Sequence, residues 1–369
     1  MQVAAIIVLG ERASFADTPE SDGFPTTGPD QLEWFAGSPI VALELLGQSA
    51  LERMMARLQS VGAQAISLVA EEDQFQVKAG MPGCRTENVL LKQPGGIWPV
   101  IGSLVDEYAT NGFDTILLIR VGAYVEFDFA DFLQFHRDKG QAVTRASDRD
   151  GPLDFWMING KHFREAGVFF HEEKCMVGKA GAEYYGGAAY VNRLLHARDI
   201  RRLVTDALEQ RLSIRPPGKE IRPGVWIDDN ARLHPRARVE GPAYIGVGAR
   251  IEATTLVAGL SNVERHSHID CGTAVGGASI LAHTYLGAWL AVSQAVVCGN
   301  KVANLRHNVT VEILDERLIK HTSSFHRAHL TSPGVRDPAD RLEPALEILK
   351  PQRSVFRAAR ALFLAKRTQ

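Results

Sequence analysis

An aliphatic residue recurs at every sixth position along a stretch that begins at Ile227 and ends at Leu281. Four places after nine of these ten residues stands alanine, serine or threonine. A period of six fits neither the 3.6-residue repeat of a helix nor the two-residue alternation of an ordinary strand. The repetition predicts a coil of parallel β-structure in which the aliphatic side chains stack into one buried column. The ten residues are Ile227, Leu233, Val239, Ile245, Ile251, Val257, Val263, Ile269, Val275 and Leu281.

The six-residue phase breaks once, between Leu281 and Leu286, and then resumes at Leu286, Val292 and Cys298. The missing residue predicts a distorted corner. Two interpretations stay open, a tolerated deletion and a corner reshaped around a ligand, because irregularity in a regular scaffold tends to mark function. Residues from about 222 to 318 are expected to form roughly five coils.

Composition excludes several classes of protein. The chain has 369 residues and a formal charge of -2, so nothing in its balance favours a nucleic-acid partner. Its four cysteines are scattered without metal-ligand spacing, and no metal site is expected. The absence of a signal segment or a long apolar span predicts a cytoplasmic location. The cysteines are Cys84, Cys175, Cys271 and Cys298.

The first part of the chain alternates strand and helix patterns. A short apolar run from Val3 to Leu9 predicts a buried strand, and apolar residues at helical spacing follow near residue 50. This alternation predicts an α/β domain with a doubly wound, mostly parallel sheet. The expected strands are residues 3–9, 65–69 and 115–119, and the expected helices are residues 50–61, 101–108, 129–139 and 200–212.

Two segments, Pro39 to Arg53 and Phe127 to Gly140, resemble the sugar-phosphate nucleotidylyltransferases. The first is similar to that family's Pro-Lys and Gly-Lys-Pro segment, and the second to the helix after its metal-binding Asp. In this superfamily such a domain can precede a left-handed β-helix of hexapeptide repeats. The resemblance implies a Rossmann-like nucleotidylyltransferase domain over residues 1–212, a left-handed parallel β-helix over residues 213–320, and a loop with a C-terminal helix over residues 321–369.

The residues that would carry the family's chemistry are absent from their expected places. The family's glycine-rich phosphate loop is here Leu9-Gly10-Glu11-Arg12, where the acid would repel a triphosphate. The family Lys falls on Ile40, and its metal-binding Asp falls on Gly122. Losing a charge clamp and a Mg²⁺ ligand would each cost several kcal/mol of transition-state stabilisation. Gly10, Arg12 and Arg120 are the candidates to hold a phosphate, although an isolated Arg is more often solvated or structural.

A second candidate site lies in the repeats. His283-Thr-Tyr285-Leu-Gly and Ala303-Asn304-Leu-Arg306 resemble segments of β-helix domains that acetylate amino sugars from acetyl-coenzyme A. There such a His takes a proton from the sugar amine. The resemblance implies His283 as the catalytic base and Tyr285, Asn304, Arg306 and His307 as ligand-binding residues. An ordinary corner histidine, hydrogen-bonded to its neighbours, is the alternative for His283.

Two departures bear on this second site. Val297-Cys298-Gly299-Asn300 replaces the family's Gly-Ala-Gly-Thr, so part of the close backbone approach that glycine allows is lost. The same tract also resembles sugar-nucleotide synthase-like proteins of exopolysaccharide clusters. The pair His266 and His268 sits on an expected corner, and without a third ligand it is more often a solvated pair than a metal site.

The closing segment is basic and amphipathic. From Lys350 onward the chain holds no acid, while its basic residues alternate with apolar residues at helical spacing. The pattern predicts a helix over Ser354 to Lys366 that docks on this chain or on a sister subunit; contact with an anionic membrane surface through residues 350–369 is the alternative. A homo-oligomer, trimer or dimer, is expected, with the arginines facing acids expected outside the coil. Those acids are Glu240, Glu252 and Glu264.

Three functions follow as alternatives. The first is a catalytically weak or inactive homologue of nucleotidylyltransferases that binds a sugar nucleotide or sugar phosphate in polysaccharide or cell-envelope sugar metabolism. The second is a sugar acetyltransferase that uses His283, and the third is a genuine nucleotidylyltransferase with substituted residues. A nucleotide or acetyl-coenzyme A is the cofactor that these alternatives imply, and Mg²⁺ is expected only if nucleotidylyl transfer persists.

Overall fold

The computed structural model describes residues 2–9, 31–36, 40–70, 84–90, 97–149, 151–163, 169–171, 174–176, 183–187 and 189–322. Two of the predicted phosphate-binding residues, Gly10 and Arg12, and the predicted helix over residues 354–366 lie outside these residues. The chain divides into two compact units. Unit 1 is Met1–Leu43 with Gln48–Asp199, and unit 2 is Glu44–Gly47 with Ile200–Gln369.

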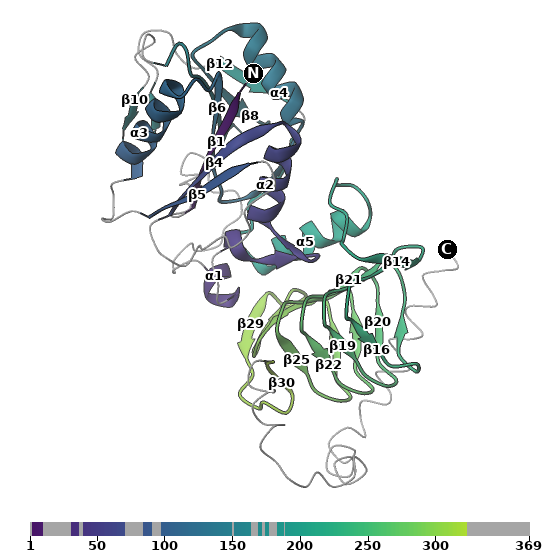
Figure 1. The fold of residues 1–369 in the computed structure, drawn as a ribbon. Coiled ribbons are helices and arrows are strands. Elements are labelled where there is room, and N and C mark those ends of the chain that lie inside the picture. The colour runs from purple at the N-terminus through teal and green to yellow at the C-terminus, as the bar shows by residue number, and fades with distance from the viewer. Residues whose placement is uncertain are drawn as a thin grey trace. The chain divides into compact units, whose positions relative to one another are not determined.

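Unit 1 is a mixed α/β fold around a seven-stranded sheet in the order β12-β8-β9-β6-β1-β4-β5 (Figure 1). β1 pairs in parallel with β4 and β6, whereas β9 runs antiparallel to β6 and β8. The fold is compatible with a Rossmann-like domain. The strands are β1 (Val3–Leu9), β4 (Ala63–Ala70), β5 (Arg85–Leu90), β6 (Thr115–Arg120), β8 (Val143–Ser147), β9 (Pro152–Asn159) and β12 (Glu183–Gly186).

β1 is buried on both faces, as its unbroken apolar run predicts. Val3, Ala5, Ile7 and Leu9 belong to one apolar core and Ala4, Ile6 and Val8 to the other. The first core is completed by α2 (Ala50–Ser60) and α4 (Phe129–Lys139), and the second by α3 (Ile97–Thr110). The predicted strands of this unit and its three predicted helices are thus confirmed, with small shifts at their ends.

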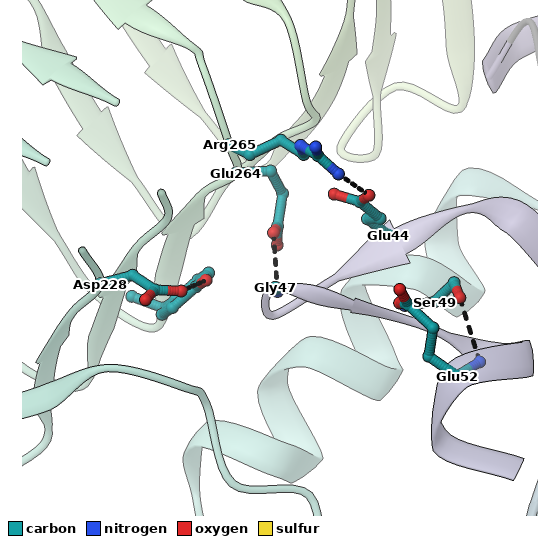
Figure 2. A network of polar contacts seen from close by, with 8 residues as sticks. Glu44, Gly47, Ser49, Glu52, Asp228, Glu264 and Arg265 are labelled. Carbon is teal, nitrogen blue, oxygen red and sulfur yellow. Dashed lines mark hydrogen bonds and ion pairs between the residues drawn. The ribbon is translucent and has the colours of Figure 1, made fainter. Parts of the chain in front are cut away.

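Local signals explain where two of these helices begin and end. Ser49 and Glu52 form a capping box at the start of α2, in which the Ser49 hydroxyl accepts from the Glu52 amide and the Glu52 carboxylate accepts from the Ser49 amide (Figure 2). The Asp128 carboxylate caps α4, and Gly140 ends it in the left-handed region with φ 60°.

Unit 2 is a coil in which the chain passes in turn through three parallel sheets. Paired strands in each sheet are 17 or 18 residues apart, as in Ile245↔Val263 and Ile269↔Leu286. The first sheet holds β15 (Val225–Ile227), β18 (Ala243–Ile245), β21 (Ser261–Val263), β24 (Ser279–Ile280) and β27 (Ala295–Cys298). The second holds β16 (Arg232–Leu233), β19 (Arg250–Ile251), β22 (His268–Ile269) and β25 (Thr284–Leu286), and the third β17 (Arg238–Val239), β20 (Leu256–Ala258), β23 (Ala274–Gly276) and β26 (Ala291–Ser293).

The every-sixth aliphatic residues of the middle coils point inward, since Ile245, Ile251 and Val257 are at most 1% exposed. The predicted phase is wrong at two positions. Val263 pairs with Ile280 and Ile280 with Val297, so these residues, and not Leu281 and Cys298, continue the column. The missing residue therefore lies between Val275 and Ile280, at a corner between the third and first sheets, and not between Leu281 and Leu286.

Helix α5 (Ala197–Leu208) begins and ends a few residues before the predicted 200–212. From Ile200 onward it belongs to unit 2, where the Arg201 guanidinium donates to the Leu260 carbonyl and to the Ser279 hydroxyl at 3.0–3.1 Å. Burial lowers the pKa of Arg201 to about 10. No helix in the described part of the chain is both long and apolar enough to cross a membrane.

Candidate functional site

The first candidate site lies where the strand order of the unit 1 sheet reverses. After β1, the chain adds β4 and β5 on one side, and then β6 on the other side of β1. Ligands of open α/β sheets bind at such a reversal, beyond the carboxyl ends of the strands. Arg120 is the last residue of β6, pairs with Val8, and is followed by Val121, whose amide donates to the Val8 carbonyl at 3.1 Å. Arg120 is therefore the described basic residue placed at this reversal.

The structure describes two residues that the resemblance aligns with catalytic positions of the nucleotidylyltransferases. Ile40, which the resemblance aligns with the family Lys, is only 4% exposed and lies in the short helix η1 (Ile40–Ala42). Gly122, which the resemblance aligns with the metal-binding Asp, lies in a bend before β7 (Tyr124–Glu126). Among the residues that the structure describes, no group of three or more His, Cys, Asp or Glu could hold a metal ion.

A polar cluster fixes the segment that follows Gly122. The Arg57 guanidinium donates to the Val125 carbonyl and to the Tyr124 hydroxyl, both at 2.7 Å, and the Tyr124 hydroxyl donates to Glu126 at 2.9 Å. Burial raises the pKa of Tyr124, which keeps its hydroxyl a hydrogen-bond donor. The cluster therefore ties β7 to α2, and it holds the bend of Gly122 beside the end of β6.

The second candidate site is a row of three histidines at a corner of the coil. His266 and His283 occupy equivalent corner positions of neighbouring coils, both in the left-handed region with φ 52° and 58°. Their ring centroids are 5.3 Å apart, and the ring of His321 stacks on His283 at 5.6 Å. His321 comes from β30 (Ile319–His321), which pairs antiparallel with β25. We call these three residues the histidine row.

The histidine row changes the chemistry of its central member. Burial and the charges of His266, His321 and Arg265 lower the pKa of His283, so its imidazole is neutral near pH 7. A neutral imidazole can accept a proton, which a general base requires. The His321 ring stacks on His283 and the His266 ring lies tilted beside it, so these two rings restrict how a reactant could approach.

The other predicted residues of this site have structural partners. Tyr285 is buried, and its hydroxyl donates to Asp270 at 2.8 Å. The Asn304 side-chain oxygen accepts from the amides of Arg306 and His307 at 3.0 and 3.2 Å, as in an ordinary turn. Arg306 and His307 are exposed. The structure therefore groups His283 with histidines and not with the Asn304 turn.

Glu264 is the largest departure from the sequence prediction. It was expected on the outside of the coil, yet it is fully buried. Its carboxylate accepts from the amides of Leu46 and Gly47 at 2.7 and 3.0 Å and from the Asn262 side chain at 2.6 Å (Figure 2). The segment Glu44–Gly47, which belongs to unit 2, supplies these amides, and an ion pair of Arg265 with Glu44 lies beside them. We call this arrangement the Glu264 seat.

The Glu264 seat fits its segment closely. Leu46 and Gly47 have φ of 52° and 76°, and a side chain at Gly47 would collide with the Tyr244 hydroxyl. That hydroxyl in turn donates to Asp228 at 3.0 Å (Figure 2). Burial raises the pKa of Glu264 to about 7, against the opposing effect of the three N–H donors.

Two of these contacts, that of Glu264 with Leu46 and that of His321 with His283, could not be predicted from local sequence patterns. Glu264 and Leu46 are 218 positions apart. His321 joins the histidine row through antiparallel pairing of β30, whereas the six-residue repeat predicts only parallel neighbours. The sequence does contain a signal for the turn itself, because Gly47 follows Leu46 and glycine favours a turn with positive φ.

Comparison with known proteins gives a distant likeness only. No family model matches the chain, and no curated protein matches it. A crystal structure of HddC from Yersinia pseudotuberculosis complexed with GMP-PN is 15% identical with a TM-score of 0.38, covering 55% of this chain and 97% of that one. A second HddC structure from the same organism is 13% identical with a TM-score of 0.37, over the same shares of the chains. Identities this low say nothing of what this chain binds.

Proposed function

We propose that this protein binds a sugar nucleotide or sugar phosphate through unit 1 and has lost efficient nucleotidylyl transfer. The observation that carries the proposal is the position of Arg120 at the strand-order reversal. The loss of transfer rests on the resemblance, which aligns Ile40 and Gly122 with the Lys and Asp that the chemistry needs. A guanidinium there can pair with a phosphate, and the described residues contain no cluster of three or more potential metal ligands. Polysaccharide or cell-envelope sugar metabolism is the proposed setting.

Binding is tested by calorimetry and thermal shift with nucleotides, sugar nucleotides and sugar 1-phosphates. We expect one of these ligands to bind, and Arg120→Gln to weaken that ligand about tenfold, because a charged hydrogen bond contributes about 1.5–3 kcal/mol. Arg137→Gln is the matched control, since Arg137 is an exposed cation near the C-terminal end of α4. Equal losses in the two variants, or no binding by the wild type, would contradict a phosphate site at Arg120.

Loss of transfer activity gives a separate prediction. Incubation with nucleoside triphosphates, Mg²⁺ and sugar 1-phosphates should release pyrophosphate no faster than a blank, because both the cation and the metal carboxylate are absent at their places. A pyrophosphate-coupled assay measures this. Robust turnover with any one pair of substrates would instead support a genuine nucleotidylyltransferase that uses substituted residues.

A sugar acetyltransferase centred on His283 is the second candidate. The lowered pKa of His283 favours it, because the neutral ring is ready to take a proton from an amine. Thiol release from acetyl-coenzyme A with a panel of amino sugars tests the idea, and activity should disappear in His283→Gln but persist in His234→Gln, at an exposed position of the coil. A wild-type protein that does not consume acetyl-coenzyme A would leave the histidine row with a structural role.

For unit 2 we further propose a left-handed β-helix that assembles as a trimer or dimer, as the six-residue repeat and its resemblance imply. The flat sides of a triangular coil favour self-association. Light scattering of the full-length chain tests the assembly, and a monomer at all concentrations would contradict it. A crystal structure of the protein would test whether the coil winds in the left-handed sense.

A further inference from the structure

The first sheet of the coil continues beyond its last parallel strand, β27. Beyond β27, the chain turns back twice to add β28 (Lys301–Asn304) and β29 (Val309–Glu312), both antiparallel, to the first sheet. Val297 pairs with Val302 and Val302 with Val311. Residues directly opposite each other share one face of a sheet. Val302 and Val311 therefore continue the inward face of Val297, and within residues 225–322 no further coil follows to cover it.

This end of the coil is where apolar side chains are exposed. Of the seven large apolar residues exposed in the described part of the chain, four lie between residues 309 and 318. Val309 and Val311 are 48% and 43% exposed, and Leu318 and Leu314 are 42% and 87% exposed. An apolar edge strand also presents unpaired backbone groups, which natural proteins normally cover. The end of a repeat array usually carries a cap for the same reason.

The chain itself continues from this end. β30 closes on β25 and finishes at His321, and 47 residues follow Thr322. Their last twenty residues are basic and amphipathic, with Val355, Phe356, Ala359, Leu362 and Phe363 at helical spacing. The connecting residues 323–349 could span up to about 90 Å when extended, so the segment can reach the edge strand.

Charge offers weaker support for the same partner. The exposed stretch carries Glu312, Asp315 and Glu316, of which the last two already pair with Arg317 and Lys320. The segment after residue 350 carries six basic residues and no acid. Its apolar stripe would meet Val309, Val311 and Leu318, and its cations would lie beside Glu312, Asp315 and Glu316.

We propose that residues 350–369 of the same chain cap this end of the coil, packing their apolar stripe on β29 and on the segment from Leu314 to Leu318. The inference concerns unit 2 and is independent of the function proposed for unit 1. It assigns an occupant to an apolar surface of the kind that otherwise marks an interaction site.

Hydrogen exchange, followed by mass spectrometry, tests the cap in the full chain. A chain that ends at residue 349 should exchange the amides of residues 302–312 at least about tenfold faster, and should bind more of a dye specific for apolar surface. The full-length variant Leu362→Asp with Phe363→Asp should behave like the truncated chain. Leu364→Asp is the matched control, because residue 364 lies on the opposite side of the predicted helix, and it should leave exchange unchanged.

Three results would overturn the proposal. Exchange at residues 302–312 could be the same with and without residues 350–369. Protection could instead grow with protein concentration over a hundredfold range, which would identify a second copy as the occupant. Protection could also arise only when vesicles of anionic phospholipid are added, which would identify a membrane surface.

Discussion

At the scale of single residues, the burial of Glu264 departs from the repeat pattern, which predicts an exposed side chain. The residue follows Val263 by one position, as Glu240 follows Val239, and Glu240 is exposed as predicted. Glu264 is buried because Leu46 and Gly47 present two amides to its carboxylate. Burial of a carboxylate is costly unless such donors compensate it. Burial of the Glu264 carboxylate therefore costs free energy, while its hydrogen bonds hold Leu46 and Gly47 in place.

Removing the Glu264 carboxylate should destabilise unit 2. Glu264→Ala leaves the Leu46 and Gly47 amides without acceptors, so we expect a loss of about 2–4 kcal/mol in urea unfolding. Glu264→Gln, which keeps one acceptor, should lose less. Glu240→Gln is the control and should stay within about 0.5 kcal/mol of the wild type. An unchanged stability of Glu264→Ala would mean that the seat contributes nothing.

The same substitution has a pH signature. The pKa of Glu264 is raised from 4.5 to about 7, so the folded chain holds a proton that the unfolded chain has released between these values. The contribution of Glu264 to stability is therefore complete below pH 4.5 and is lost as the pH rises through 7. The stability of the wild type relative to Glu264→Gln should be greater at pH 5 than at pH 8. The reverse order in urea titrations would refute the assignment.

His136 should respond to pH in the opposite sense. It is 2% exposed, its Nδ1 contacts the Thr144 hydroxyl at 2.7 Å, and burial lowers its pKa from 6.5 to about 4. The unfolded chain then binds the proton first, so stability is complete above pH 6.5 and falls by up to about 3 kcal/mol as the pH drops toward 4. His136→Gln should flatten this fall in unfolding curves, whereas His162→Gln, at an exposed position, should not.

At the scale of elements, the sequence predicts what repeats locally and fails where contacts are distant. Three of the seven strands in the unit 1 sheet and its three main helices follow from apolar spacing, and a buried column follows from the six-residue period. The phase after Val275 could not be predicted, because Ile280 and Leu281 are adjacent, both aliphatic and both buried. The candidate site residues were found singly. Their partners could not be predicted in this way. His321 lies beside His283 because β30 pairs antiparallel with β25, and no periodic pattern in the sequence predicts that pairing.

The corrected phase is open to a direct test. Val297 is fully buried in the column, whereas Cys298 is only partly buried. Val297→Ala should destabilise unit 2 by about 1.5–3 kcal/mol through lost packing, and Cys298→Ala should cost clearly less. Thermal and urea unfolding of the two variants give the comparison. A larger loss for Cys298→Ala would restore the originally predicted phase.

At the scale of the whole molecule, a residue near the start of the chain should control the stability of the coil. Gly47 has φ 76°, and a methyl group there would meet both Tyr244 and Pro217 within 2.5 Å. Gly47→Ala should therefore speed hydrogen exchange across residues 225–300. Gly62→Ala is a close control, because Gly62 has φ 82° but no atom within 4 Å of the added methyl, so it carries backbone strain of about 1 kcal/mol alone. Similar exchange over residues 225–300 in the two variants would show that the contacts of Gly47 do not matter.

The placement of Glu44–Gly47 within unit 2 also affects how the two units could be separated by gene fusion. A gene fusion that joined a foreign first domain to this coil at residue 200 would bring the whole repeat array but leave behind the four residues that cover Glu264. The recipient would hold a carboxylate facing an unfilled gap, and selection would have to replace it or supply a matching turn. A fusion at residue 200 is therefore expected to destabilise the coil unless a matching turn is supplied with it.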